Sequence, residues 1–237
     1  MTNQVGDVVL PGDELTLPLP EQSKRKVLLG PGLRQQDGKV FAAKAGILKQ
    51  KSTNTFWVDA IQKRYIPCKG ETVIGLVVQK AGDIFRVEIG SNELAALSYL
   101  AFEGATKKNR PDVNIGDLVF AKLLVAHKDF ESELICVDSM GKKQKLGVLR
   151  EGFVFNCSIN LARRLRSTEC PLLESIKKHI QVPVEIVVGM NGRVWVNARR
   201  ERDIIAVGNA ILAAEFKTDD EIDDMCDQVG ARFSGVA

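Results

Sequence analysis

The sequence predicts a multi-domain α+β protein in which two β-rich segments precede a segment that mixes helices and strands. Short apolar runs bounded by Gly and Pro fill residues 1–66, and longer runs follow in 67–145. Helical periodicity appears only after residue 146. The predicted domains are therefore a small N-terminal β-domain (1–66), a five-stranded barrel of the oligonucleotide-binding type (67–145) and an α+β domain with C-terminal helices (146–237).

Composition sets the class of protein and excludes several functions. The 237 residues are 45% hydrophobic and 27% charged, which is typical of a globular chain. The net charge is only +3, so binding of nucleic acid would have to come from local clusters. Five cysteines without a C-x-x-C pair indicate reduced thiols and argue against zinc. We find no signal-peptide pattern and no apolar run of about 20 residues, so neither secretion nor a membrane span is expected.

The N-terminal domain is predicted from brief, turn-bounded apolar runs with β-forming residues. Gly30-Pro31-Gly32 lies between two of these runs and is interpreted as a turn. The runs that predict strands are VVLPGDEL (8–15), KVLLGPGL (26–33), KVFAAKAGIL (39–48) and TFWVDAI (55–61).

The predicted barrel has longer strands with clearer alternation. Phe85, Val87 and Ile89 alternate with polar residues, as expected of a half-buried strand, and Ala81-Gly82-Asp83 suits a hairpin connection. A polar, basic loop follows the third strand, at 104–117. The five predicted strands lie in 71–82, 83–90, 93–100, 117–129 and 132–138.

The C-terminal third predicts the order strand, helix, helix, strand, strand, helix, and then a last helix. Pro171 suits the first turn of the second helix, and Thr218 with Glu221 forms a capping-box pattern before the last one. The predicted strands are 152–158, 182–189 and 193–198, and the predicted helices are 158–168, 171–180, 201–216 and a segment from 218.

The stretch GMNGRVWV (189–196) contains a G-x-x-G sequence, which in some nucleic-acid-binding modules clamps the sugar–phosphate backbone. Such a clamp lies between two helices, whereas this loop lies between two β-forming runs. The loop that does join two helices, 166–170, has no glycine. Asn191-Gly192 favours a type I′ hairpin turn, in which both residues have positive φ. We therefore predict a structural turn made by Gly189, Asn191 and Gly192, with Gly189 allowing close approach of another backbone and Trp195 packing between domains.

No catalytic or metal-binding constellation is predicted. His127 follows an apolar strand and His179 ends a helix, and no Ser or Cys motif accompanies either. Four acidic residues near the start of the last helix are explained by the helix dipole, and their spacing does not match a calcium loop. These are Asp219, Asp220, Asp223 and Asp224. We therefore expect no catalytic residue, no metal and no cofactor.

The barrel, followed by a KH-like domain with GMNGRVWV, resembles the S1/KH cap subunits of the eukaryotic RNA exosome. LSYLAFEGATKKNRPDVNIGDLV (97–119) resembles the S1 domain of that family. The resemblance covers nearly the whole chain and implies that the KH clamp is replaced by a G-x-N-G turn buried near the S1 domain.

The resemblance also implies a function. It implies a non-catalytic subunit that sits with the other cap subunits on a ring of RNase-PH-like subunits and holds the ring together. The subunit guides single-stranded RNA to an associated 3′→5′ exonuclease, in ribosomal RNA maturation and RNA turnover. The expected location is the nucleus, including the nucleolus, and the cytoplasm. No membrane and no small-molecule substrate are expected.

The candidate RNA-binding residues lie on the S1 barrel and its basic loop. Lys107, Lys108 and Arg110 share the loop beside Tyr99, and Phe85 is a candidate for stacking on a base. Two alternatives stay open: the charges serve only solubility, and the Phe85 ring, which shares its parity with core residues, belongs to the core. The alternative function is therefore a pure assembly subunit without RNA contact.

Two further basic clusters flank the predicted domain junction. The first helix of the KH-like domain carries three arginines, for which a solvated face is favoured over contacts with RNA or a neighbouring subunit. The lysines near 143 are interpreted as a charged interdomain linker. The arginines are Arg163, Arg164 and Arg166, and the lysines are Lys142, Lys143 and Lys145.

Overall fold

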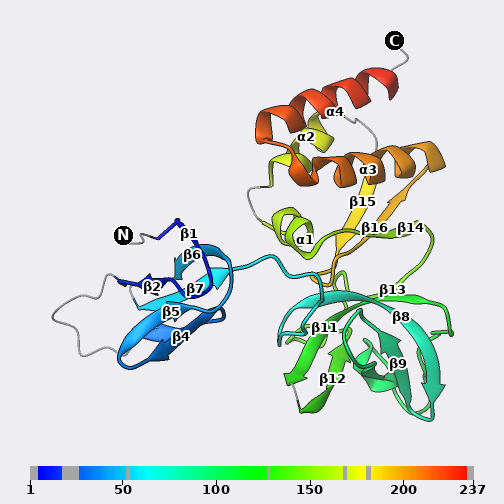
Figure 1. Ribbon diagram of the computed structural model, residues 1–237. Helices are drawn as coiled ribbons and strands as arrows, with labels where there is room; N and C mark the ends of the chain where they lie inside the picture. Colours follow the sequence, from blue (N-terminus) through cyan, green and yellow to red (C-terminus); the bar gives the residue numbers. More distant parts are fainter. Residues whose placement is uncertain are drawn as a thin grey trace. The chain divides into compact units, whose positions relative to one another are not determined.

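The computed structural model describes residues 5–17, 27–51, 54–127, 129–167, 170–179 and 183–233 (Figure 1). The chain divides into two compact units, Met1–Gln62 and Lys63–Ala237. The first unit ends at residue 62, and Tyr65 belongs to the core of the barrel. The predicted strand start at 26 and the middle of the helix-joining loop, residues 168 and 169, lie outside the described residues.

The first unit contains two small sheets, with strand orders β1-β6-β7-β3 and β2-β5-β4. Three of the predicted runs each hold parts of two strands, because a turn interrupts them; in 8–15 the turn has Gly12 at φ 98°. Val9, Leu48 and Phe56 are fully buried between the sheets. The strands are β1 (Val8–Val9), β2 (Glu14–Leu15), β3 (Leu28–Leu29), β4 (Leu33–Gln36), β5 (Lys39–Ala42), β6 (Gly46–Lys51) and β7 (Thr55–Asp59).

Gly30-Pro31-Gly32 is a turn that also packs directly on β7. A Cβ atom at Gly30 would lie 2.9 Å from Cβ of Trp57, and one at Gly32 would lie 2.7 Å from Cβ of Val58. Gly32 also has φ 83°, and the Pro31 carbonyl accepts a hydrogen bond from the Val58 N–H at 3.0 Å. Glycine is thus required at both positions by the close approach of two backbones.

The second unit begins with a closed five-stranded barrel, as predicted. β12 pairs with both β10 and β11, which closes the sheet β12-β10-β9-β8-β11 on itself. Phe85, Val87 and Ile89 are buried, so the alternation predicted for this strand is confirmed. A short strand that was not predicted, β13 (Gly147–Leu149), pairs with the start of β11. The barrel strands are β8 (Thr72–Ala81), β9 (Ile84–Glu88), β10 (Ala95–Ser98), β11 (Leu118–His127) and β12 (Phe130–Ile135).

The KH-like domain has a three-stranded antiparallel sheet, in the order β14-β16-β15, with helices on one face (Figure 1). Ser158 caps the first helix through its Oγ, and the Thr218 N–H donates to Glu221 at 2.9 Å, which is the Glu221 half of the predicted capping box. The elements are β14 (Phe153–Asn156), α1 (Ile159–Leu165), α2 (Pro171–His179), β15 (Val184–Val188), β16 (Arg193–Ala198), α3 (Glu201–Ala213) and α4 (Asp219–Phe233).

The two faces of this sheet pack against different partners. Val194 and Val196 lie in the core formed with the helices. Val154, Val187 and Trp195 alternate with them and pack in the core of the barrel instead. One face of the KH-like sheet therefore completes the apolar core of the barrel, while the other face forms a second core with the helices.

Candidate nucleic-acid interface

The loop Gly189–Gly192 is a hairpin turn, but not of the predicted type. The Gly189 N–H donates to the Arg193 carbonyl at 2.8 Å, and Gly192 has φ 78°. Asn191 does not have positive φ, so the type I′ prediction is wrong. A single residue with positive φ at the end of the loop is the pattern of a longer hairpin with a glycine bulge. The described non-glycine residues with positive φ are Asp37, Gln144 and Glu151.

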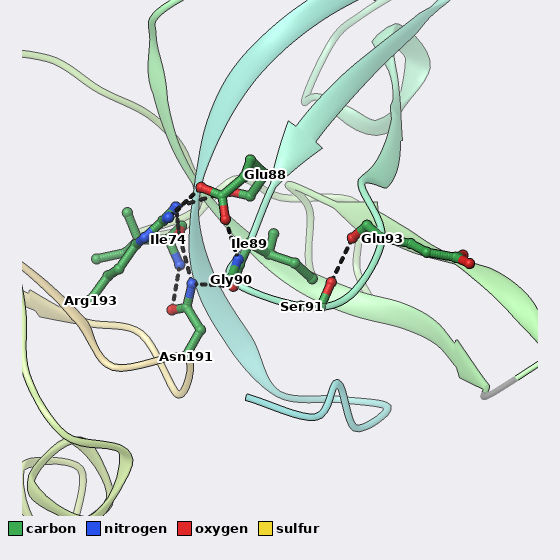
Figure 2. Close-up of polar contacts among 8 residues, drawn as sticks. All are labelled: Ile74, Glu88, Ile89, Gly90, Ser91, Glu93, Asn191 and Arg193. Carbon is green, nitrogen blue, oxygen red and sulfur yellow. Dashed lines mark hydrogen bonds and ion pairs between the residues drawn. The ribbon is translucent and has the colours of Figure 1, made fainter. Parts of the chain in front are cut away.

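The side chain of Asn191 is bonded to the backbone of two barrel strands. Its Nδ2 donates to the Ile74 carbonyl at 2.8 Å and to the Ile89 carbonyl at 2.9 Å, and its Oδ1 accepts from the Ile74 N–H at 3.3 Å. Figure 2 shows the amide lying between these groups. The amide thus uses both of its N–H donors and one lone pair of its oxygen on polar groups of β8 and of the end of β9.

Neighbouring residues of the loop extend this contact with the barrel. The Met190 N–H donates to the Thr72 carbonyl at 2.9 Å. The Arg193 guanidinium donates to the Glu88 carbonyl at 2.9 Å, to the Ile74 carbonyl at 3.3 Å and to the Glu88 carboxylate (Figure 2). A charge-assisted pair of this kind fixes the register of the loop on β8 and β9.

Both glycines of the loop are required by space. A Cβ atom at Gly189 would lie 2.4 Å from Oδ1 of Asn191 and 2.8 Å from the Ile74 N. A Cβ atom at Gly192 would lie 2.6 Å from the Cys157 carbonyl oxygen. The G-x-N-G sequence therefore serves close packing on the barrel and on the segment between β14 and α1, and both of its glycines are buried.

Trp195 continues the same junction. Its side chain is 3% exposed and packs with barrel residues, and its Nε1 donates to the Glu151 carbonyl at 2.9 Å. Gly152 leaves room for the ring, because a Cβ atom there would lie 2.9 Å from the indole. The indole thus lies between the two domains of this unit, with its polar atom satisfied.

The three basic residues of the S1 loop differ in their contacts: Arg110 is ion-paired, whereas Lys107 and Lys108 are exposed. Arg110 pairs with Asp83 at 3.1 Å, and its guanidinium lies 4.9 Å from the ring centroid of Tyr99. Lys107 and Lys108 are exposed and make no ion pair or hydrogen bond within the described chain. Arg110 therefore ties the loop to the β8–β9 turn, while the two lysines remain available to phosphates.

The two aromatic candidates are buried in the barrel. Phe85 is 8% exposed and packs edge-on against Phe102, with ring centroids 6.4 Å apart, while Lys80 lies 5.9 Å from the Phe85 ring. Tyr99 is 5% exposed. These rings leave little surface on which a base could stack, so the lysines are the accessible members of the candidate set.

Arg163 and Arg166 are exposed, as the favoured solvated face requires, but Arg164 is half-buried, and both Arg164 and Arg166 also bond other parts of the fold. Arg164 bonds Asp219 at 2.7 Å and donates to carbonyls between α3 and α4. Arg166 donates to the Thr72 hydroxyl at 2.6 Å and to the Val188 carbonyl at 3.2 Å. Both guanidinium groups thus join elements of the fold. The helical periodicity of the sequence shows only that these two arginines lie outside the apolar face of the helix. It does not show which residues they contact.

A polar cluster between α2 and α4 was not predicted. His179 contacts Asp223 at 3.0 Å and Asp227 at 3.2 Å. Hydrogen bonds from Lys178, Ser175 and His179 lower the pKa of Asp223 to about 2. Ser175 donates to the carboxylate rather than to the imidazole, so the serine lacks the base that a nucleophile needs. The cluster is best explained as a polar link between two helices.

The described residues offer little reactive or metal-binding chemistry. No group of three or more His, Cys, Asp or Glu in the described chain is placed to hold a metal ion. All five cysteines are free thiols, and burial raises the pKa of Cys136 to about 12 and that of Cys157 to about 11, which disfavours the reactive thiolate. Within the described ranges, no helix is both long and apolar enough to cross a membrane.

Comparison with known proteins agrees with this geometry. Three family models match: the S1 domain of exosome complex component RRP40 over residues 65–147, a KH domain over 152–202, and the N-terminal region of mammalian RRP40 over 7–61. A crystal structure described as that of a candidate exosome complex RNA-binding protein has TM-score 0.57 and 21% identity over 72% of this chain and 99% of its own, which is a likeness of fold.

Sequence relatives cover nearly the full length of the chain. Exosome complex component RRP40 of Drosophila melanogaster is 48% identical over 94% of this chain and 95% of its own. The Homo sapiens component is 40% identical over 92% and 88%, and the Saccharomyces cerevisiae component is 32% identical over 89% and 90%. By sequence and by domain content, the chain belongs to the RRP40 family of exosome complex components.

Proposed function

We propose that this chain is a non-catalytic subunit of the RNA exosome that stabilises the complex and guides single-stranded RNA toward its 3′→5′ exonuclease. The observation that supports this proposal most directly is the basic loop of the S1 barrel. Its two lysines, Lys107 and Lys108, are exposed and unpaired within the described chain, while Arg110 holds the loop in place. Family membership supports the assembly in which this loop would act.

In this proposal the lysines contact the RNA backbone and do not read its sequence. Two exposed ammonium groups attract phosphates by a screened, non-directional interaction. Without exposed aromatic rings beside them, base stacking adds little affinity, because the rings of Phe85 and Tyr99 are buried. RNA binding by the isolated chain is therefore expected to be weak, salt-sensitive and independent of sequence.

The G-x-N-G loop supplies the scaffolding part of this function. Asn191 and Arg193 bond the KH-like sheet to the barrel, so these two domains form one structural element. We propose that protein partners, namely RNase-PH-like ring subunits and the other cap subunits, meet the N-terminal β-domain and the KH-like domain. The expected location is the nucleus, including the nucleolus, and the cytoplasm, which imaging of the tagged protein tests.

The RNA role is tested by the salt dependence of binding. K107A/K108A should lower the slope of log affinity against log salt by about 1.4, because each phosphate contact on a single strand contributes roughly 0.7. The matched control is K44A/K63A, which removes two exposed lysines outside this loop and should leave the slope unchanged. Equal slopes for the wild type and K107A/K108A would remove this loop from the RNA path.

The absence of catalysis is tested separately. The purified chain, incubated with end-labelled RNA and Mg²⁺, should leave the RNA at full length. Shortened products that persist after further purification would contradict the proposal.

The second candidate is a pure assembly subunit without RNA contact. The burial of Phe85 and Tyr99 favours it, since it removes the stacking surfaces of the barrel. Crosslinking of RNA in the reconstituted complex separates the two. Crosslinks at the loop 104–117 support RNA guidance, and their absence from the whole chain supports assembly alone.

A further inference from the structure

A cleft of about 790 Å³ lies within the second unit, between the end of the barrel domain and the KH-like domain. Its size is within the range of ligand-binding pockets. Aliphatic side chains of α2 and β15 line it, including Leu173, Ile176, Val184 and Ile186. The S1 loop discussed above does not contribute to this lining.

One wall of the cleft is the free edge of a sheet. Among the described strands, β15 pairs only with β16, in the order β14-β16-β15. Gly189 is hydrogen-bonded to Arg193, so by antiparallel alternation the N–H and C=O groups of Val184, Ile186 and Val188 point away from β16. The Val188 carbonyl is taken by Arg166, as this alternation requires. In the described part of the chain, no hydrogen bond occupies the outward groups of Val184 and Ile186.

The rim of the cleft is positively charged. Lys143, Lys145 and Lys177 are exposed and make no side-chain ion pair with any described residue, whereas Arg150 pairs with Asp112 at 2.9 Å. Against these cations, Glu185 is the acidic residue of the described lining. The charge of the rim is thus complementary to an acidic ligand.

The loop that carries two of these lysines is held in place. Asp138 accepts hydrogen bonds from the Lys142 N–H at 2.9 Å and from Nε2 of Gln144 at 2.5 Å. The Lys143 N–H donates to Glu103 at 3.1 Å. The position of the charges relative to the apolar floor is therefore set before a ligand binds, which lowers the entropy cost of binding.

The lining favours a peptide over RNA. The aromatic ring in the described lining is Trp195, which is 3% exposed and has its N–H bonded to Glu151, so no ring surface is open for a base. A free strand edge, aliphatic surface for alternate side chains and a charged rim are the features of strand addition.

We propose that this cleft binds an extended acidic segment of a partner protein, which adds a strand to the edge of β15. The segment would bond the outward groups of Val184 and Ile186, place alternate aliphatic side chains on the floor, and direct carboxylates at Lys143, Lys145 and Lys177. This inference does not depend on RNA guidance by the S1 loop.

The first test selects short peptides from a displayed random library against the full chain and measures their affinity by fluorescence anisotropy. Selected peptides should carry acidic and aliphatic residues in alternation. K143Q/K145Q/K177Q should weaken their binding about tenfold, since each exposed charge pair contributes roughly a two- to threefold factor. K107Q/K108Q, which neutralises exposed lysines elsewhere, is the matched control and should bind as the wild type does.

The second test locates the added strand by amide hydrogen exchange with NMR detection. A selected peptide should slow exchange at Val184 and Ile186, whose N–H groups point outward, and leave Glu185 and Val187 unchanged, because these two already bond β16. The substituted lysines are exposed, so circular dichroism should show the triple variant folded like the wild type.

Several outcomes would overturn the inference. These are a selection that enriches no peptide, selected peptides without acidic residues, or equal binding by K143Q/K145Q/K177Q and the wild type. Protection of the same two amides by oligo-uridylate, with no protection by any selected peptide, would assign the cleft to RNA instead.

Discussion

Replacing Asn191 with Ala should destabilise the junction between the barrel and the KH-like domain by about 2–3 kcal/mol. The substitution removes the three hydrogen bonds of the side chain to the barrel. The Ile74 carbonyl keeps a bond from Arg193, but the Ile74 N–H and the Ile89 carbonyl lose their partner. Each buried group left unsatisfied costs roughly 1–3 kcal/mol, and the half-buried position of Asn191 favours the lower part of the summed range.

The unfolding of this unit can be followed by its own tryptophan. The chain has two, Trp57 in the first unit and Trp195 at the junction. In a W57F background, the fluorescence in urea therefore reports Trp195 alone, and the midpoint and slope give the free energy of unfolding. Asn209→Ala is the matched control, because it makes the same substitution on an exposed helical position and should change stability by under about 0.5 kcal/mol.

Two results would refute the reasoning on Asn191. One is a loss of stability no larger than that of the Asn209 control. The other is a loss of RNA affinity in a variant with unchanged stability, which would make the loop a clamp. Asn191→Asp adds a second check: it keeps the shape but turns a second acceptor toward the Ile74 and Ile89 carbonyls, so it should destabilise at least as much as Ala.

Three further predictions concern other parts of the second unit. Trp195→Phe should lower the urea-unfolding free energy, followed here by circular dichroism, by about 2 kcal/mol, because it removes the bond to Glu151 and part of the buried ring. Phe85→Ala should lower it by about 3 kcal/mol and leave the salt slope of RNA binding of the folded protein unchanged. The pKa of Asp223 is lowered from 3.8 to about 2, so its stabilising contribution is complete above pH 4 and is lost as pH falls toward 2. Thermal melts of the wild type and Asp223→Asn should therefore differ at neutral pH and converge toward pH 2.

Much of the fold follows from local pattern. The two-residue period of Phe85, Val87 and Ile89 sets the inner face of the barrel, and burial confirms it. The residue types at Thr218 and Glu221 also predicted the bond between them at the start of the last helix. In contrast, β13 has only three residues and is too short to show a period.

The details of the candidate site depend on contacts between distant residues, and local pattern does not show these. Asn-Gly is compatible with more than one hairpin, and here the choice is made by bonds between Asn191 and Ile74, which are 117 positions apart. Arg164 likewise meets Asp219, 55 positions away. The sequence could show that the loop was a turn and that the arginines lay off the apolar face, but not the partners that decide their roles.

The alternation of side chains along β16 explains why the G-x-N-G loop has a structural role and does not clamp RNA. Arg193 and Trp195 point to the barrel, while Val194 and Val196 point to the helices, because side chains alternate along a strand. Asn191, in the loop before the strand, continues the barrel-facing set. A shift of register by one residue would turn all three barrel contacts toward the helices and bring valines to the polar groups of β8. The glycines fix that register by allowing the backbones to touch, so the loop cannot be freed to grip RNA without separating the two domains.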